Sequence, residues 1–295
     1  MMEKILITGA AGFLGVNISK KLLLNENNVI FGIDDFSSSD VSNLYQLLKN
    51  SNYNFIQGDV LDCELPYADK IFHFAGCATL EKYYENKYDF INKNLKILDK
   101  VFSHTNQTGA KLIMVEDFVD SSKFNKEKFC YYNYLNLAEN LALEYKYNNK
   151  TNINIARLSP LYGGNISKFH LQPIEKIIYK ALENKNITLK SNYFDYYTFV
   201  DDAIEALVIL MDKYVDCDVV DISVSEMFPI SDIVDFIINY TKSKSKVEIK
   251  DISFAKANYI PDTKYLKKEF DFECSCDFKN NLTKTIDYFV AMYFS

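Results

Sequence analysis

The chain has few of the residues that bind phosphates, nucleic acids or membranes. Of its 33 basic residues only Arg157 is an arginine, and arginine is the usual bidentate partner of a phosphate group. The net charge of −7 disfavours a protein that reads duplex nucleic acid, because such a protein needs a basic face. No apolar run is long enough to span a bilayer. We therefore expect neither nucleic acid nor a membrane as a partner.

Histidine and cysteine are also scarce. The three histidines are scattered, so we expect no metal centre. None of the six cysteines forms a Cys-x-x-Cys pair, and a chain of 295 residues does not need disulfide bonds to fold. We interpret the cysteines as free thiols in a reducing compartment. The first expected strand begins at Lys4, which leaves no room for a signal peptide, so the sequence predicts a cytoplasmic protein.

The first half of the chain alternates between expected strands and expected helices. Apolar, β-rich segments lie at 4–8, 28–33, 53–57, 70–74, 111–115 and 153–158, and helical periodicity at 16–24, 40–50, 86–106 and 131–149. This order predicts an α/β fold with a doubly wound parallel sheet covered on both faces. Later helices are expected at 171–184, 200–213, 231–240 with Ser231 as N-cap, and twice within 262–295. They predict a smaller mixed lobe.

A glycine-rich turn connects the first strand to the first helix. Gly9, Gly12 and Gly15 lie at a spacing of three and three, and Asp34 ends the second strand 19 residues beyond Gly15. This pattern is typical of a Rossmann-type dinucleotide site, in which the helix N-terminus faces the pyrophosphate and the acid binds the ribose. An acid there repels a 2′-phosphate, so NAD is favoured over NADP. The alternative is a turn that serves packing alone.

Further motifs occur in the same order over nearly the whole chain. They are Thr8–Gly15 (TGAAGFLG), Asp34–Ser37 (DDFS), Gly58–Val60 (GDV), His73–Gly76 (HFAG), Arg157–Gly164 (RLSPLYGG), Val200–Asp202 (VDD) and Pro261–Thr263 (PDT). Together they resemble the extended short-chain dehydrogenase/reductase family, which contains the NAD-dependent nucleotide-sugar epimerases and dehydratases. The resemblance implies a dinucleotide-binding domain at 1–165 plus 193–224, and a substrate-binding lobe at 166–192 plus 225–295.

The resemblance also implies a set of cofactor contacts. The positions that match are Gly9, Gly12, Phe13, Leu14, Gly15, Asp34, Asp35, Phe36, Asp59, Val60, Phe74, Ala75 and Gly76. Asp59 is expected at the adenine, although capping of a strand end is an equal alternative. His73 borders the cofactor or is a packed, hydrogen-bonded side chain. The resemblance further implies a homodimer formed through the helices near 86–106 and 131–149.

The expected active site departs from the family pattern. Tyr131 aligns with the catalytic tyrosine, but Leu135 takes the place of the lysine four residues later. By counting from the fifth strand, Asp117 takes the place of the Ser/Thr, and Glu116 is an alternative base. A lost cation would leave the tyrosine pKa about 1–3 units higher than in the family. We predict Tyr131 and Asp117 as the catalytic residues.

Two substrate-side positions differ as well. Pro160 replaces the family asparagine and Asp195 replaces the arginine that clamps the substrate phosphates. Lys168, Lys176 and Lys190 are candidate substitutes by location only. Three hypotheses remain open. The chain is an NAD-dependent nucleotide-sugar epimerase, dehydratase or ketoreductase in surface-polysaccharide biosynthesis, or a family member that binds NAD or a nucleotide sugar without turnover, or a structural relic.

Overall fold

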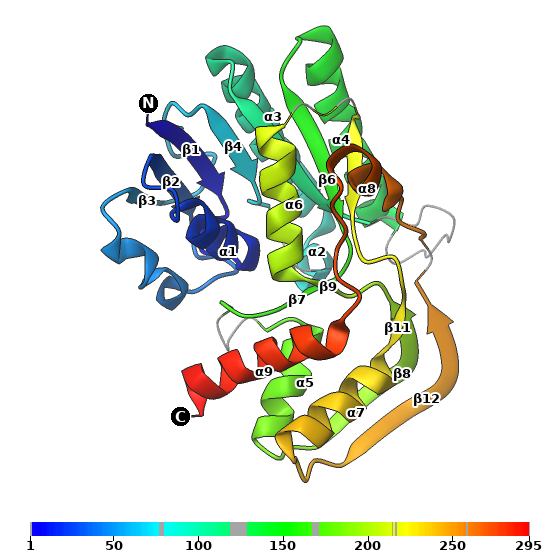
Figure 1. Ribbon diagram of the computed structural model, residues 1–295. Coiled ribbons are helices and arrows are strands. Elements are labelled where there is room, and N and C mark those ends of the chain that lie inside the picture. The colour runs from blue at the N-terminus through cyan, green and yellow to red at the C-terminus, as the bar shows by residue number, and fades with distance from the viewer. Residues whose placement is uncertain are drawn as a thin grey trace. The chain divides into compact units, whose positions relative to one another are not determined.

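The backbone forms two compact units. The computed structural model describes residues 2–76, 80–118, 129–166, 171–213, 215, 217–257 and 259–294. The first unit comprises residues 1–157 and 207–220, and the second comprises 158–206 and 221–295. Figure 1 shows the course of the chain through both. The division into a dinucleotide-binding domain and a substrate-binding lobe assigns a function to each part of the chain, and it stays a prediction.

A seven-stranded sheet forms the centre of the first unit, with the strand order β10-β6-β5-β4-β1-β2-β3. The strands are β1 (Glu3–Thr8), β2 (Asn28–Asp34), β3 (Tyr53–Gln57), β4 (Lys70–His73), β5 (Lys111–Asp117), β6 (Ile153–Leu158) and β10 (Val219–Ile222). β1 pairs in parallel with β2 and β4, and β4 pairs in parallel with β5. Strand order therefore reverses next to β1, which is where a doubly wound sheet opens a crevice at its carboxyl edge.

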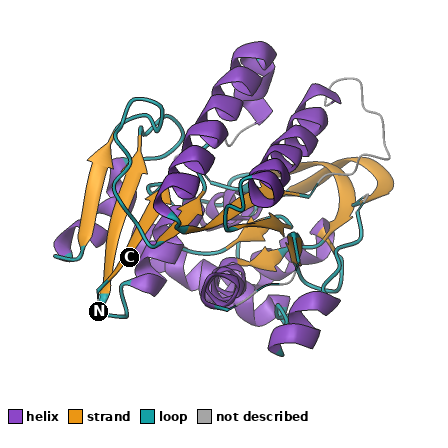
Figure 2. Cartoon of the chain, turned by 90° about the horizontal axis from the view of Figure 1, so that it is seen from above, coloured by secondary structure: helices purple, strands orange, loops and turns teal. Residues whose placement is uncertain are grey.

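Helices cover this sheet, as the purple helices and orange strands of Figure 2 show. They are α1 (Phe13–Leu22), α2 (Leu80–Glu85), α3 (Lys87–Thr108) and α4 (Phe129–Asn148), with the short 3₁₀ turns η1 (Val41–Leu44) and η2 (Leu47–Lys49). α3 packs against α4. Their buried side chains, such as Val101, Phe102 and Ala142, share one apolar core with Leu6 and Ile71 of the strands. Burial of this apolar face is the main force that holds the helices to the sheet.

The second unit combines a small sheet with three packed helices. Its elements are β7 (Leu161–Tyr162), α5 (Pro173–Leu182), β8 (Ile187–Asp195), β9 (Thr198–Phe199), β11 (Phe228–Pro229), α7 (Ile230–Thr241), β12 (Val247–Lys256), α8 (Lys264–Phe270) and α9 (Phe278–Tyr293). Helix α6 (Val200–Asp212) begins in this unit, and its residues from 207 onward belong to the first unit. The sheet order is β11-β8-β12, and α5, α7 and α9 pack against one another. Within the described part of the chain, no helix is long and apolar enough to cross a bilayer.

The α/β prediction is confirmed, and two local expectations are wrong. The expected helix at 40–50 is two 3₁₀ turns, η1 and η2. Ser231 is not an N-cap: Pro229 caps α7, and the Ser231 amide donates to Asn192 Oδ1 at 3.3 Å. That bond comes from a residue 39 positions away in the sequence. Local sequence therefore could not reveal that the helix begins one residue earlier.

Candidate functional site

The glycine-rich turn closes on the ends of two strands in the first unit. Gly9 has a φ of +71°, and a Cβ there would lie 2.8 Å from the backbone of Phe74 and Ala75. A Cβ on Gly15 would lie 2.2 Å from the Gly9 carbonyl oxygen. Only glycine allows this backbone conformation and this close approach. The turn is thus held against the segment that follows β4.

The first turn of α1 is arranged to receive an anion. Gly12 is the N-cap and offers no side chain to the amide groups of the first turn, which also contains no acidic residue. The leading N–H groups of a helix have no intrahelical acceptor, and the helix dipole favours negative charge there. Asn43 Nδ2 donates to the Ala11 carbonyl at 2.9 Å and holds the turn open from the other side. These residues fit the pyrophosphate of a dinucleotide.

Asp34 fastens the end of β2 to this turn. Its carboxylate accepts the Ala11 amide at 3.0 Å through Oδ2, and the Phe36 amide and Ser39 hydroxyl through Oδ1, both at 2.8 Å. Asp34 is 9% exposed. A carboxylate has about four acceptor positions, so one remains on Oδ2 for a ribose hydroxyl. The predicted ribose contact is therefore compatible with the geometry, and Asp34 also shapes the turn.

Phe36 and Val60, two of the predicted cofactor contacts, differ in where their side chains lie. Phe36 has a φ of 57°, and its ring centroid lies 5.3 Å from that of Phe55, so the aromatic pair flanks the end of β2. The Val60 side chain is buried in the core of the first unit, which leaves its backbone for any contact with a cofactor.

His73 is a packed structural side chain rather than a charged group. Its Nδ1 lies 2.6 Å from Thr8 Oγ1, which also accepts the Ala75 amide at 3.3 Å. Burial lowers the pKa of His73 to about 4, so the imidazole is neutral at physiological pH. These bonds position Phe74, Ala75 and Gly76 beside the glycine-rich turn.

Tyr131 and Asp117 lie together at the end of β5 and the start of α4. The Tyr131 hydroxyl donates to Asp117 Oδ2 at 3.2 Å. The Tyr131 ring packs against Tyr83 and Phe90, with centroids 5.6 Å and 6.1 Å away. Burial and the Asp117 carboxylate raise the pKa of Tyr131. The phenol is therefore protonated when the site is at rest, with its proton already directed at a carboxylate.

The position predicted to align with the family lysine is apolar, and the Arg157 guanidinium is paired with an acid. Leu135 is 5% exposed. Arg157 forms a bidentate pair with Glu139, with both N···O distances at 2.6 Å. The largest effects on the Tyr131 pKa come from burial, acids and another tyrosine. Tyr131 thus has a proton acceptor, Asp117, within hydrogen-bond distance of its hydroxyl.

Glu116 lies behind this pair and carries a proton at neutral pH. It is 7% exposed, and its Oε2 has no hydrogen-bond partner among the described residues. Burial and the charges of Glu139 and Asp117 raise the pKa of Glu116 to about 9, against the opposing effect of Arg157. A second negative charge in this pocket would be costly because Arg157 already pairs with Glu139.

The substrate-side departures lie in the second unit. Asp195 Oδ1 accepts hydrogen bonds from the Tyr259 hydroxyl at 2.7 Å and from the Tyr196 amide at 2.8 Å. Its carboxylate therefore links the end of β8 to the segment that follows β12. Lys176 and Lys190 are exposed, and Lys168 lies outside the described residues. The aromatic residues of 193–199 contact one another and Tyr259.

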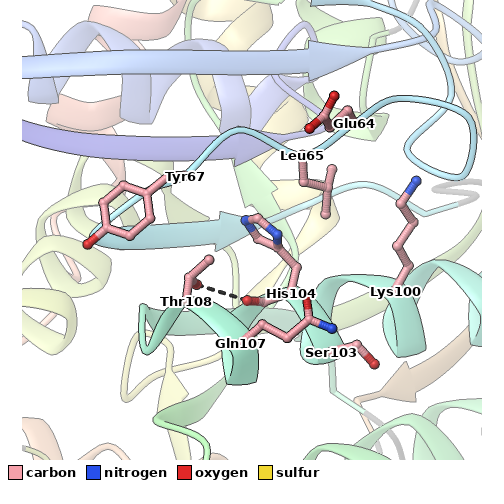
Figure 3. Close-up of a pocket in the computed structure, with 8 residues that line it drawn as sticks. All are labelled: Glu64, Leu65, Tyr67, Lys100, Ser103, His104, Gln107 and Thr108. Carbon is pink, nitrogen blue, oxygen red and sulfur yellow. Dashed lines mark hydrogen bonds between the residues drawn. The ribbon is translucent and has the colours of Figure 1, made fainter.

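A cavity of about 620 Å³ lies elsewhere in the first unit, between α3 and the segment 64–67 (Figure 3). Its polar side chains serve the protein itself. Lys100 donates to the Leu61 and Cys63 carbonyls, both at 2.7 Å, and His104 Nε2 lies 3.1 Å from the Pro66 carbonyl. The polar side chains that line the cavity thus connect α3 to the segment that precedes β4. In the described part of the chain, no group of three His, Cys, Asp or Glu side chains could hold a metal.

Sequence reasoning missed the residues that support the site. Ser39, Asn43 and Thr8 bond to predicted site residues or their turn, and Lys93 of α3 lies 2.6 Å from Asp59 Oδ2 and 3.9 Å from Asp35 Oδ2. The spacing of seven between Lys93 and Lys100 could have placed both on one helix face. It could not have shown which loops that face meets.

These features define a dinucleotide-binding α/β protein, and comparison with known proteins identifies its family. Residues 5–223 match the NAD dependent epimerase/dehydratase family, and the chain belongs to this family. UDP-glucuronic acid decarboxylase 1 of Danio rerio is 22% identical over 97% of this chain and 72% of its own length. UDP-glucuronic acid decarboxylase 6 of Arabidopsis thaliana is 24% identical over 71% of this chain and 66% of its own length.

A solved structure shows the same fold. UDP-glucuronic acid 4-epimerase from Bacillus cereus, in complex with UDP-glucuronic acid and NAD, superposes with a TM-score of 0.84 at 21% identity. The match covers 98% of this chain and 100% of that one. The predictions of the family, the Rossmann-type fold, an enzyme class and NAD as cofactor are confirmed. The alternative of a member without turnover has no support in these comparisons, and the roles predicted for individual site residues stay predictions.

Proposed function

We propose that the chain is an NAD-dependent enzyme that acts on a nucleotide sugar by epimerisation, dehydration or keto reduction. The observation that carries the proposal is the hydrogen bond from Tyr131 to Asp117, in the same unit as the glycine-rich turn. The pair offers a protonated phenol that can exchange a proton with a sugar hydroxyl. Its carboxylate can accept that proton.

The proton step uses both residues. As the sugar hydroxyl loses its proton to the Tyr131 oxygen, Tyr131 passes its own proton to Asp117 Oδ2, 3.2 Å away. The phenol is neutral before and after the transfer, so the step does not require a lysine, although a cation beside the phenol oxygen would stabilise negative charge that develops there during the transfer. The negative charge of Asp117 passes to the substrate oxygen and leaves the sugar with the hydride, which bound NAD would accept, so the oxygen ends as a neutral carbonyl and Asp117 as a neutral acid.

The bound cofactor is expected to lie along the carboxyl edge of β1, β2 and β4. Gly12, Phe13, Leu14 and Gly15 would hold the pyrophosphate through backbone groups, and Asp34 the ribose. NAD, when bound, supplies a hydride acceptor for the sugar carbon and a hydride donor for the return step. Phe74, Ala75 and Gly76 would close the nicotinamide side of the turn.

The substrate class follows from the family and its named relatives. The relatives described above act on or bind UDP-glucuronic acid, so UDP-sugars are the first compounds to test. Surface-polysaccharide biosynthesis in the cytoplasm is the setting we propose, because nucleotide sugars are its building blocks.

We further propose a homodimer formed through α3 and α4. Leu95, Leu137 and Leu141 line a shallow apolar depression on these helices, and Leu137 is 48% exposed. Leu137→Glu is expected to convert a dimer into a monomer in analytical ultracentrifugation. A wild-type protein that sediments as a monomer would contradict this part of the proposal.

The first experiment identifies what the purified protein carries. The protein is denatured, and the released small molecules are analysed by absorbance and mass spectrometry. We expect release of NAD or NADH, and a UDP-sugar released with it would identify the substrate class. If nothing is released, NAD and UDP-sugars are added and product formation is followed by NMR. A protein that neither retains NAD nor binds it when added would overturn the proposal.

A further inference from the structure

Three carboxylates surround the place where the adenosine half of NAD is expected. Asp34 and Asp35 end β2, and Asp59 follows β3. Asp34 is bound to the turn by three donors. Asp35 and Asp59 are less buried, with side chains 31% and 20% exposed. A dinucleotide brings two further negative charges on its pyrophosphate, so this site needs a nearby cation to limit repulsion.

Lys93 of α3 is placed between two of these acids. Its Nζ lies 2.6 Å from Asp59 Oδ2 and 3.9 Å from Asp35 Oδ2, so one ammonium group bridges the loops that follow β2 and β3. Burial acts to raise the pKa of Asp59, but the hydrogen bonds from Lys93 and the Leu61 amide outweigh it and the pKa is lowered. The Asp59 carboxylate is thus ionised, and Lys93 offsets part of the negative charge around it.

Lys100 provides the internal contrast. It lies seven residues further along α3 and also meets the loop after β3, but its Nζ donates to the backbone carbonyls of Leu61 and Cys63. Lys100 therefore ties α3 to the loop and acts on Asp59 only through space, whereas Lys93 pairs with the carboxylates of both Asp35 and Asp59. If Lys93 served only to hold α3 to these loops, removing either lysine would have the same effect on cofactor binding.

We propose that Lys93 is a determinant of cofactor binding and specificity, which offsets Asp35 and Asp59 and thereby sets both the affinity for NAD and the penalty against NADP. The inference rests on the proposed NAD site. A 2′-phosphate on the ribose bound at Asp34 would add two negative charges near Asp35. Its repulsion is therefore smallest while Lys93 is present and largest when Lys93 is removed.

The test measures dissociation constants for NAD and NADP by calorimetry on the purified, cofactor-stripped protein. Because the lysine is partly exposed, Lys93→Met is expected to weaken NAD binding about three- to tenfold at low ionic strength, with the difference shrinking as salt is added. NADP binding should weaken more than NAD binding. Lys93→Arg, which keeps the positive charge, should bind NAD and NADP with affinities close to those of the wild type. Lys100→Met should lower thermal stability and change the NADP-to-NAD ratio much less than Lys93→Met does, because Lys100 acts on Asp59 only through space.

A second variant tests the same inference without removing the lysine. Asp35→Asn should raise the affinity for NADP relative to NAD about three- to tenfold, because the charge of Lys93 is then less offset. The double variant Asp35→Asn/Lys93→Met should lose that rise. Unchanged or tighter NAD binding by Lys93→Met, or a rise that persists in the double variant, would overturn the inference while the proposed function stands. A wild-type protein that binds neither dinucleotide would overturn both.

Discussion

Two strand ends of the first unit differ in how closely their residues match the family pattern. The turn after β1 matches it, and the residues predicted to be catalytic near the end of β5 depart from it. At the end of β1, the glycines of the turn sit where a Cβ would collide with backbone, and Asp34 binds three groups around the turn. At the end of β5 and on α4, Asp117 and the buried Leu135 stand at positions that the sequence predicts to align with the Ser/Thr and the lysine of the family. The glycine-rich turn thus has the backbone geometry of the family pattern, whereas the site near the end of β5 has a carboxylate and an apolar side chain instead of a hydroxyl and a cation.

The contrast shows that cofactor binding and proton transfer are separate demands on the same sheet. The dinucleotide turn depends on backbone geometry, which few residue types satisfy. Proton transfer depends on a matched pair of acid and base, which several residue types can supply. A tyrosine with a carboxylate acceptor is thus a different solution to proton transfer on an unaltered cofactor scaffold.

The sharpest test of the contrast is Tyr131→Phe. It removes the hydroxyl that donates to Asp117 but leaves the glycine-rich turn intact, so turnover of the accepted UDP-sugar should fall about 10²–10⁴-fold with NAD affinity unchanged. Steady-state kinetics and calorimetry measure the two effects. Tyr132→Phe, next to it on α4, is the matched control and should keep turnover within about threefold. Equal losses in both variants would show that Tyr131 has no special role.

The opposite separation is expected at Gly15. In Gly15→Ala the added Cβ lies 2.2 Å from the Gly9 carbonyl oxygen, so the turn must shift. We expect a loss of about 1–3 kcal/mol in the free energy of unfolding and at least tenfold weaker NAD binding. Among the described residues, the added Cβ of Gly76→Ala would meet Asn94 Oδ1 alone, at 3.5 Å, so this variant should change stability by less than about 0.5 kcal/mol. Denaturant titrations of both variants decide whether the close approach matters.

The changed charge at β5 predicts a pH dependence of stability. The pKa of Glu116 is raised from 4.5 to about 9 in the folded protein, so the folded state binds more protons than the unfolded state between these values. The free energy of unfolding should therefore fall as pH rises through this window. Glu116→Gln keeps the neutral form and should gain about 1–3 kcal/mol at pH 8.

Urea denaturation at pH 6 and pH 9 measures this effect. The wild type should lose more stability between the two values than Glu116→Gln does. A parallel loss in both proteins would mean that Glu116 is ionised in the folded state and that the charge balance described here is wrong.

The smallest expected effect comes from restoring the family lysine. Leu135→Lys places a cation one helical turn from Tyr131 and should lower the pKa of that phenol by about 1–3 units. A burial cost offsets part of this gain, so we expect about a tenfold rise in turnover or in nicotinamide affinity. Leu135→Met controls for packing. If the lysine changes neither quantity, Tyr131 is not the residue that aligns with the family tyrosine.

Much of the fold was accessible from local pattern. The glycine spacing, Asp34 and the alternation of strands and helices predicted the first unit closely, with β1, β2, β3 and β6 within one residue of expectation. The strands β8 and β12 were missed because they pair with each other, Ile187 with Val247, and such pairing leaves little trace in either segment alone. Ser231 was misassigned for the same reason, since Asn192 meets its amide.

The candidate site divides in the same way. Sequence alone determined the dinucleotide turn, the acid after β2 and the identities at 117, 131 and 135, because these depend on residue type and short spacing. Only the tertiary structure brought Tyr131 to Asp117, buried Glu116 near Glu139 and Arg157, and set Lys93 between Asp35 and Asp59. Charges act through space over several ångströms, so their balance is decided where separate segments of the folded chain meet.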